Sequence, residues 1–175
     1  KTIKMYNLII IFMFIFSFVC SNGDTKKINE PQKENNPSGN SKQTVNLGDK
    51  QAIIPATEKM EWAFGRNYKT FTPTAEDIQS AEEILSACYN KEVTGTVNPF
   101  LGRKLEDYYR QYVGGVKENG EKIIYINCFC YIMDLYADQW KTELIMVDDG
   151  GNCYFNVKAN LDKKEYYELM VNGLP

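Results

Sequence analysis

The pattern of apolar and polar positions is richest in strand-forming residues over residues 121–132, and it predicts the central strand of a sheet there. The stretch is dense in Ile, Tyr, Phe and Cys, which favour a pleated, packed surface. Asn119-Gly120 stands directly before it, the strongest short-range signal for a hairpin. Both faces of such a strand would be largely apolar, carrying Ile124, Ile126, Cys128, Cys130 and Ile132 on one side and Ile123, Tyr125, Asn127, Phe129 and Tyr131 on the other. We therefore expect it inside the sheet rather than at its edge.

A helical spacing of apolar residues predicts one amphipathic helix before this strand. Thr72, followed by Pro73, or Thr74, with Asp77 three residues later, can cap its start. We expect the helix to end near Asn90. Its apolar face would consist of Ile78, Ala81, Leu85 and Cys88.

Four more segments have the composition and turn signals of strands, namely 105–117, 140–147, 152–160 and 166–171. Met60, Trp62 and Phe64 also alternate with other residues as a strand would. One helix laid across a four- to five-stranded antiparallel meander is an α+β domain, so this is the predicted fold class. The strand at 121–132 would bury its Ile124 face against the helix.

The N-terminal pattern predicts export. Two lysines within residues 1–4 precede an almost unbroken apolar run over 8–19, which is typical of a signal peptide and too short to span a bilayer comfortably. Cys20 ends the run as the lipid-modified cysteine of a bacterial lipoprotein does. Val19 fits that motif poorly, and signal cleavage after Ser21 is the alternative.

The next segment, residues 20–58, would hold the lipid-anchor site and a disordered linker, because it is rich in Asn, Lys, Gln, Ser, Gly and Pro. Ala52-Ile53-Ile54-Pro55 is a less polar piece that can dock on the domain or simply belong to the linker. The α+β domain is then expected over residues 59–175.

Composition excludes several functions. The 175-residue chain carries a net charge of -3 and no basic block, so nucleic-acid binding is not expected. It contains no histidine, which excludes a Ser-His-Asp triad, a Cys-His dyad and His-ligated zinc or haem. We predict no metal site and no cofactor. Asp148 to Asn152 lack the spaced ligands of a calcium loop and are explained by a turn.

The domain cysteines are Cys88, Cys128, Cys130 and Cys153, and all four can face the layer between helix and sheet. They would be buried thiols or would form at least one disulfide. A bridge between Cys128 and Cys130 would be strained, because side chains two apart on a strand run parallel about 6.6 Å apart. Pairings that join Cys88 and Cys153 to the other two are therefore preferred.

Tyrosines suggest an interaction surface on the sheet face away from the helix, since tyrosine anchors interfaces at low entropic cost. The candidates are Tyr112, Tyr125, Tyr131 and Tyr154. Separately, Gln111-Tyr112-Val113-Gly114-Gly115 matches the Q-x-V-x-G pattern that cystatins insert into cysteine proteases. A strand with a glycine kink or bulge is the simpler explanation of that segment.

Several stretches resemble a family of small uncharacterised secreted proteins and lipoproteins of Gram-negative bacteria. The resemblance lies in Phe64-Gly65-Arg66, residues 70–74, residues 110–130 and residues 149–155. It implies a compact helix-plus-sheet domain with a cystatin-like fold, and it brings no catalytic residue with it.

Together these observations predict an exported bacterial protein, held at a membrane by an N-terminal lipid anchor, with a non-enzymatic binding or assembly role. Its partner would be a protein or a small molecule. The alternatives are a cystatin-like protease inhibitor and an enzyme that uses thiols or carboxylates.

Overall fold

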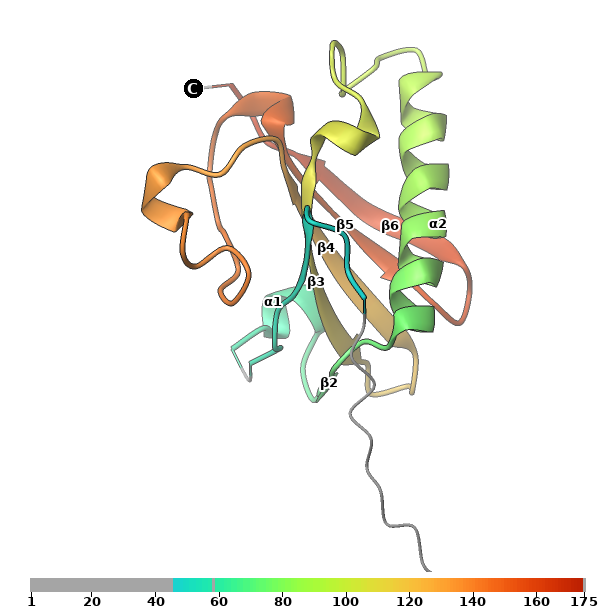
Figure 1. Cartoon of the computed structure of the whole chain (residues 1–175). Helices are drawn as coiled ribbons and strands as arrows, with labels where there is room; N and C mark the ends of the chain where they lie inside the picture. Colours follow the sequence, from blue (N-terminus) through green and yellow to red (C-terminus); the bar gives the residue numbers. More distant parts are fainter. Residues whose placement is uncertain (1–45, 58, 175) are drawn as a thin grey trace, which may run out of the picture. The chain divides into compact units, whose positions relative to one another are not determined.

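The computed structural model describes residues 46–57 and 59–174, which form one long helix and a six-stranded mixed sheet (Figure 1). The helices are α1 (Glu61–Phe64) and α2 (Ala75–Val93). The strands are β1 (Gln51–Ile53), β2 (Lys69–Phe71), β3 (Tyr109–Val116), β4 (Lys122–Phe129), β5 (Tyr154–Asn160) and β6 (Glu165–Val171). The α+β class and the helix-on-sheet arrangement are confirmed, whereas the sheet is mixed rather than a purely antiparallel meander.

The sheet has a different cover on each side (Figure 1). α2 packs on one side, here called the helix face. α1 and the long segment 130–153 cover the other, here called the loop face. Each face has its own buried apolar core.

β4 is the central strand, as the sequence predicts. It pairs antiparallel with β3 and with β5, and the turn before it has Gly120 at φ 88, where glycine is favoured. Its alternation also follows the prediction. Ile124, Ile126 and Cys128 lie in the helix-face core, and Ile123, Tyr125 and Phe129 lie in the loop-face core.

α2 begins where its capping residues predict. The Thr74 side chain accepts a hydrogen bond from the backbone of Asp77 while the Asp77 carboxylate accepts one from the backbone of Thr74. The helix ends at Val93, slightly later than expected. Its buried side chains are Ile78, Ala81, Ile84, Leu85 and Cys88.

The antiparallel run β3-β4-β5-β6 agrees with the predicted meander, but the strand expected over 140–147 is wrong. β4 pairs directly with β5, and the described segment 130–153 between them contains no strand. The pattern over 140–147 is strand-like because this segment also buries apolar side chains, including Trp140 and Ile145. Its backbone is bonded by side chains instead of by a neighbouring strand.

β1 lies in a part of the chain that the sequence analysis assigned to the linker. Gln51–Ile53 pairs parallel with β3, and Ile54 N donates to Tyr112 O at 2.9 Å. Ala52 and Ile54 are buried, so the fold begins before residue 59. Three residues are too few for a periodic signal, and only the free edge of β3 makes them a strand.

β2 pairs with the other half of the same β3 edge, and two glycines allow the contact. A Cβ on Gly114 would lie 2.6 Å from Phe71 O, and one on Gly115 would lie 2.5 Å from the Phe64 ring. The glycine pair therefore serves close packing rather than a kink.

The strand pattern of Met60, Trp62 and Phe64 is also wrong, because these residues belong to or precede the single turn α1. Phe64 is buried over Gly115, while Trp62 stays 51% exposed. Alternation over so few residues fits a helical turn equally well, and the packing of Phe64 decides between the two.

Candidate functional site

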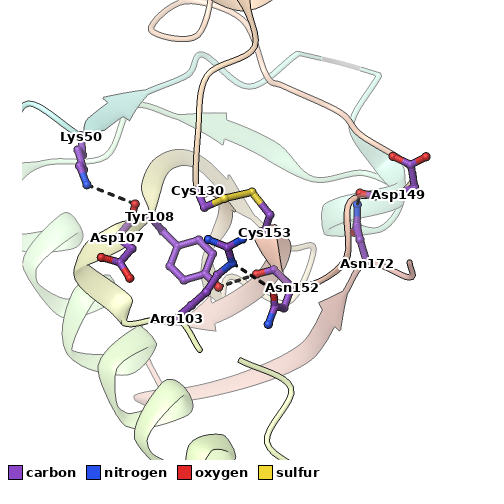
Figure 2. Close-up of a disulfide and its surroundings, with 9 residues drawn as sticks. All are labelled: Lys50, Arg103, Asp107, Tyr108, Cys130, Asp149, Asn152, Cys153 and Asn172. Carbon is purple, nitrogen blue, oxygen red and sulfur yellow. Dashed lines mark hydrogen bonds between the residues drawn. A yellow bond between two sulfur atoms is a disulfide. The ribbon is translucent and has the colours of Figure 1, made fainter. Parts of the chain in front are cut away.

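A disulfide between Cys130 and Cys153 joins the end of β4 to the start of β5 (Figure 2). The two Cα atoms are 5.0 Å apart, and Cys130 N donates to Cys153 O at 3.0 Å. The bridge therefore closes the base of segment 130–153, which covers the loop face. Cys130 lies past the end of β4 and contacts both cores rather than the helix face alone.

Figure 2 shows how neighbouring segments hold the turn next to this disulfide. Tyr108 Oη donates to Asn152 O at 2.5 Å, and Arg103 Nε donates to Asn152 Oδ1 at 3.1 Å. Asn172 Nδ2 donates to Asp149 O at 3.0 Å and to Val147 O at 2.5 Å. In place of the tight hairpin turn expected at 148–152, the structure has a bend followed by the 3-10 helix Gly151–Cys153, which side chains of Arg103, Tyr108 and Asn172 hold in place.

Cys88 and Cys128 are free, buried thiols in the helix-face core. Burial, with Glu92 adding to it, raises the pKa of Cys88 to about 12. Burial also raises the pKa of Cys128 far above its usual range. Because the thiolate is the reactive form, both cysteines are inert at neutral pH. The preferred pairings included a Cys130–Cys153 bridge, whereas Cys88 remains unpaired.

Two side-chain amides of the sheet, those of Gln111 and Asn127, bond the backbone of segment 130–153 where it crosses the loop face. Gln111, which is fully buried, donates from Nε2 to Trp140 O and to Glu143 O, each at 2.6 Å. Its Oε1 accepts from Ile145 N at 2.9 Å and from Asn127 Nδ2 at 3.0 Å. Asn127 Nδ2 also donates to Ile145 O at 2.7 Å. These bonds replace the ladder that a strand at 140–147 would have made.

The buried position of Gln111 also bears on the cystatin-like motif. Gln111, Tyr112 and Val113 are fully buried within β3, so the motif is not presented on a loop. The Tyr112 hydroxyl hydrogen-bonds to the Glu82 carboxylate, and Arg110 Nη1 lies 3.5 Å from Glu82 Oε2. Burial, followed by the charge of Glu82, raises the pKa of Tyr112 strongly. This cluster ties α2 to the sheet.

The predicted tyrosine surface is largely wrong. Tyr112 lies on the helix face, and Tyr125 and Tyr154 are covered in the loop-face core. Tyr131, at 52% exposed, is the one candidate of the four with a large accessible surface. The covering residues 54–57, 59–68 and 130–153 include only short helical turns, and the residue pattern carries no signal that they fold over these rings.

A groove of about 420 Å³ opens on the loop side between two of these covering segments. The lining residues come from the segment that precedes and includes Trp62 and from segment 130–153, and we call this hollow the Trp62 groove. Its lining comprises Ile54, Pro55, Thr57, Lys59, Met60, Trp62, Thr142, Glu143, Leu144 and Met146. Trp62 and Met146 are 51% and 58% exposed, and the Trp62 ring packs edge-on against Tyr125 at 5.1 Å. The volume and the apolar lining match those of ligand pockets.

The residue pattern does not reveal this groove, because it predicts one strand at Trp62 and another at Met146. The signal in the sequence that could have indicated this groove is Trp62, a tryptophan that directly follows the charged residue Glu61 near the expected start of the domain. A second hollow, of about 400 Å³, lies beside α2 and includes Arg110. Arg110 Nη2 there donates to Leu105 O at 2.8 Å, so this guanidinium is already engaged. The Trp62 groove is the better candidate site.

Within the described residues, no helix is long and apolar enough to cross a membrane. The same part of the chain holds no group of three or more His, Cys, Asp or Glu side chains placed to bind a metal ion. The predicted signal peptide and Cys20 lie outside the described residues.

No protein-family model, no curated protein and no solved structure matches this chain. The resemblance to small secreted proteins and lipoproteins of Gram-negative bacteria therefore stays a prediction from the residues that carry it.

Proposed function

We propose that this chain is an exported bacterial protein, tethered to a membrane through Cys20, whose folded domain binds a ligand and catalyses no reaction. The observation that carries the proposal is the Trp62 groove, which has the size and apolar lining of a ligand site. Half-exposed Trp62 and Met146 present the large apolar contact area typical of binding hot spots and adaptable binding surfaces.

The Cys130–Cys153 disulfide supports export. Disulfides form and persist in oxidising compartments such as the periplasm and the cell surface, and they are rare in the bacterial cytosol. The disulfide thus points in the same direction as the charged start and apolar run of residues 1–19, on independent grounds.

The alternatives have less support. An inhibitor that inserts Gln111 to Gly115 into a protease needs that segment exposed, and here most of it is interior strand. An enzyme that uses a thiol nucleophile needs an accessible thiolate, and Cys88 and Cys128 are buried with raised pKa values.

The anchoring half of the proposal is tested with a C20S variant. We expect the parent chain in the membrane fraction and the variant in the soluble exported fraction. Recovery of both chains in the soluble fraction would contradict lipid anchoring at Cys20.

The binding half is tested with the apolar fluorescent dye anilinonaphthalene sulfonate. We expect the folded parent to bind the dye and Trp62→Ala to weaken binding about tenfold, since a truncated aromatic hot spot costs well over 1 kcal/mol. Tyr131→Ala is the matched control, because Tyr131 is equally exposed but lies outside the groove. Equal loss in both variants, or none in either, would exclude the groove as the site.

A further inference from the structure

One side of the Trp62 groove has the features of an unpaired strand edge. The residues concerned, 143–147, include Glu143, Leu144 and Met146 of the groove lining. Glu143 O and Ile145 N and O are bonded by Gln111 and Asn127, and Val147 O accepts from Asn172. Alternate residues, namely Glu143, Ile145 and Val147, thus make these hydrogen bonds, and their bonded backbone groups point toward the sheet.

The intervening residues leave their backbone groups free. Within the part of the chain that the structure describes, the N–H and C=O groups of Leu144 and Met146 have no hydrogen-bond partner. In an extended segment, alternate residues direct these groups to opposite edges. The edge formed by Leu144 and Met146 therefore faces away from Gln111, and both residues line the groove.

We infer that the ligand of the Trp62 groove is an extended, uncharged peptide segment that adds as a strand to the edge formed by Leu144 and Met146. This inference rests on the proposed binding function and names the class of partner. Strand addition takes its affinity from main-chain hydrogen bonds and its specificity from pockets for alternate side chains. Four backbone groups that have no partner among the described residues supply the bonds, and Trp62 and Met146 supply the apolar contacts.

The charges of the groove favour an uncharged segment. Lys59 and Glu143 both line it and contribute one charge of each sign, so the groove offers no net attraction to an acidic or a basic peptide. A charged side chain would also lose solvation against the apolar lining without a dedicated partner.

The outer edge of β6 is the longest competing place for strand addition, since β1 and β2 at the other end of the sheet have three residues each. It is poorly suited to the task. Glu168 adopts φ 51, and the register between β5 and β6 shifts between Asn156 and Lys158, which bends the edge. The exposed charges of Glu165 and Glu168 add to this protection against pairing.

The test uses the protein in its natively processed form, with fluorotryptophan in place of both tryptophans. The two tryptophans give two fluorine resonances, of which Trp62 reports on the groove and buried Trp140 is the internal control. The probe is a pool of short uncharged peptides with Val, Leu, Ile or Phe at alternate positions and Ser, Thr or Gln between them.

Binders from this pool are then made in two forms, N-methylated at either the odd or the even backbone nitrogens. Strand addition uses only one of these two sets, so we expect one form to bind about tenfold more weakly than the other. The Trp62 resonance should shift on binding, while the Trp140 resonance stays in place.

The other outcomes separate the inference from the proposed function. Binding at Trp62 that is equally affected by both methylation patterns would overturn strand addition. A shift with the dye but with no peptide of the pool would overturn the peptide inference and leave a binding groove. If neither the dye nor any peptide shifts the Trp62 resonance, both proposals are wrong.

Discussion

The two faces of the sheet are covered by chain segments that satisfy their backbones in different ways. On the helix face, α2 bonds its own N–H and C=O groups, so its attachment needs only the apolar core that includes Leu85 and the bonds of Glu82 to Tyr112 and Arg110. On the loop face, segment 130–153 bonds its own backbone in short turns, chiefly over residues 133–143. Its buried backbone groups are bonded by Gln111 and Asn127 from the sheet.

This difference has a consequence for function. A cover that depends on a few side-chain bonds leaves some of its backbone without a partner among the described residues, as at Leu144 and Met146. The helix face offers no comparable edge, because α2 uses its backbone internally. The candidate ligand site accordingly lies on the loop side.

The largest expected effect compares the two cores directly. Ile126 on the helix face and Ile123 on the loop face are both fully buried in β4. Ile126→Ala should lower the free energy of unfolding by about 4 kcal/mol, and Ile123→Ala by about 2 kcal/mol, because an irregular cover can collapse further into the cavity. Urea unfolding of both variants measures the difference. Equal losses would show that the two covers are equally rigid.

Removing the disulfide should lower the free energy of unfolding somewhat less than Ile126→Ala does. The Cys130→Ala/Cys153→Ala double variant should lose roughly 3 kcal/mol of stability, since the bridge closes a 23-residue separation in the unfolded chain. Amide hydrogen exchange should become faster over 130–153 while α2 keeps its protection. The reduced parent chain is the matched comparison, and faster exchange in α2 would contradict a local role for the bridge.

A smaller effect is expected from Gln111→Leu, which keeps the volume but removes the amide. Three backbone groups of segment 130–153, at Trp140, Glu143 and Ile145, lose their partner. We expect a loss of about 2 kcal/mol, because part of the segment can turn its freed groups to water. Thermal unfolding measures it, with Gln139→Leu, at an exposed glutamine of the same segment, as the control. An unchanged midpoint would mean that the amide does not hold the segment.

The smallest effect near neutral pH comes from the helix-face thiols. The pKa of Cys88 is raised by burial from 9.0 to about 12, so between these values the unfolded chain releases a proton that the native chain keeps. Stability should therefore be unaffected by Cys88 below pH 9 and fall as pH rises toward 12. One proton limits this slope to about 1.4 kcal/mol per pH unit. Cys88→Ala should flatten it in pH-dependent urea unfolding, and an unchanged slope would contradict the assignment.

Local sequence signals were sufficient for α2, for β4 and for the hairpin that joins β3 to β4. Thr74 and Asp77 cap the helix within its own first turn, and Asn119-Gly120 turns the chain into β4 without outside help. The face assignments of Ile123 and Ile124 likewise follow from the alternation of one strand. Each of these features depends on contacts between residues close in sequence, and for that reason the residue pattern contains them.

The tertiary structure alone decided the cover of the loop face and the candidate site. β1 is a strand only because β3 has a free edge beside it, and 140–147 is not one because Gln111 and Asn127 bond its backbone. The sequence narrowed the cysteine pairing, and the meeting of the ends of β4 and β5 selected Cys130–Cys153. The exposure of Trp62, and the burial of the tyrosines expected at the surface, depend on segments far apart in the chain. Such contacts carry no periodic signal, so they appear only when the chain is folded.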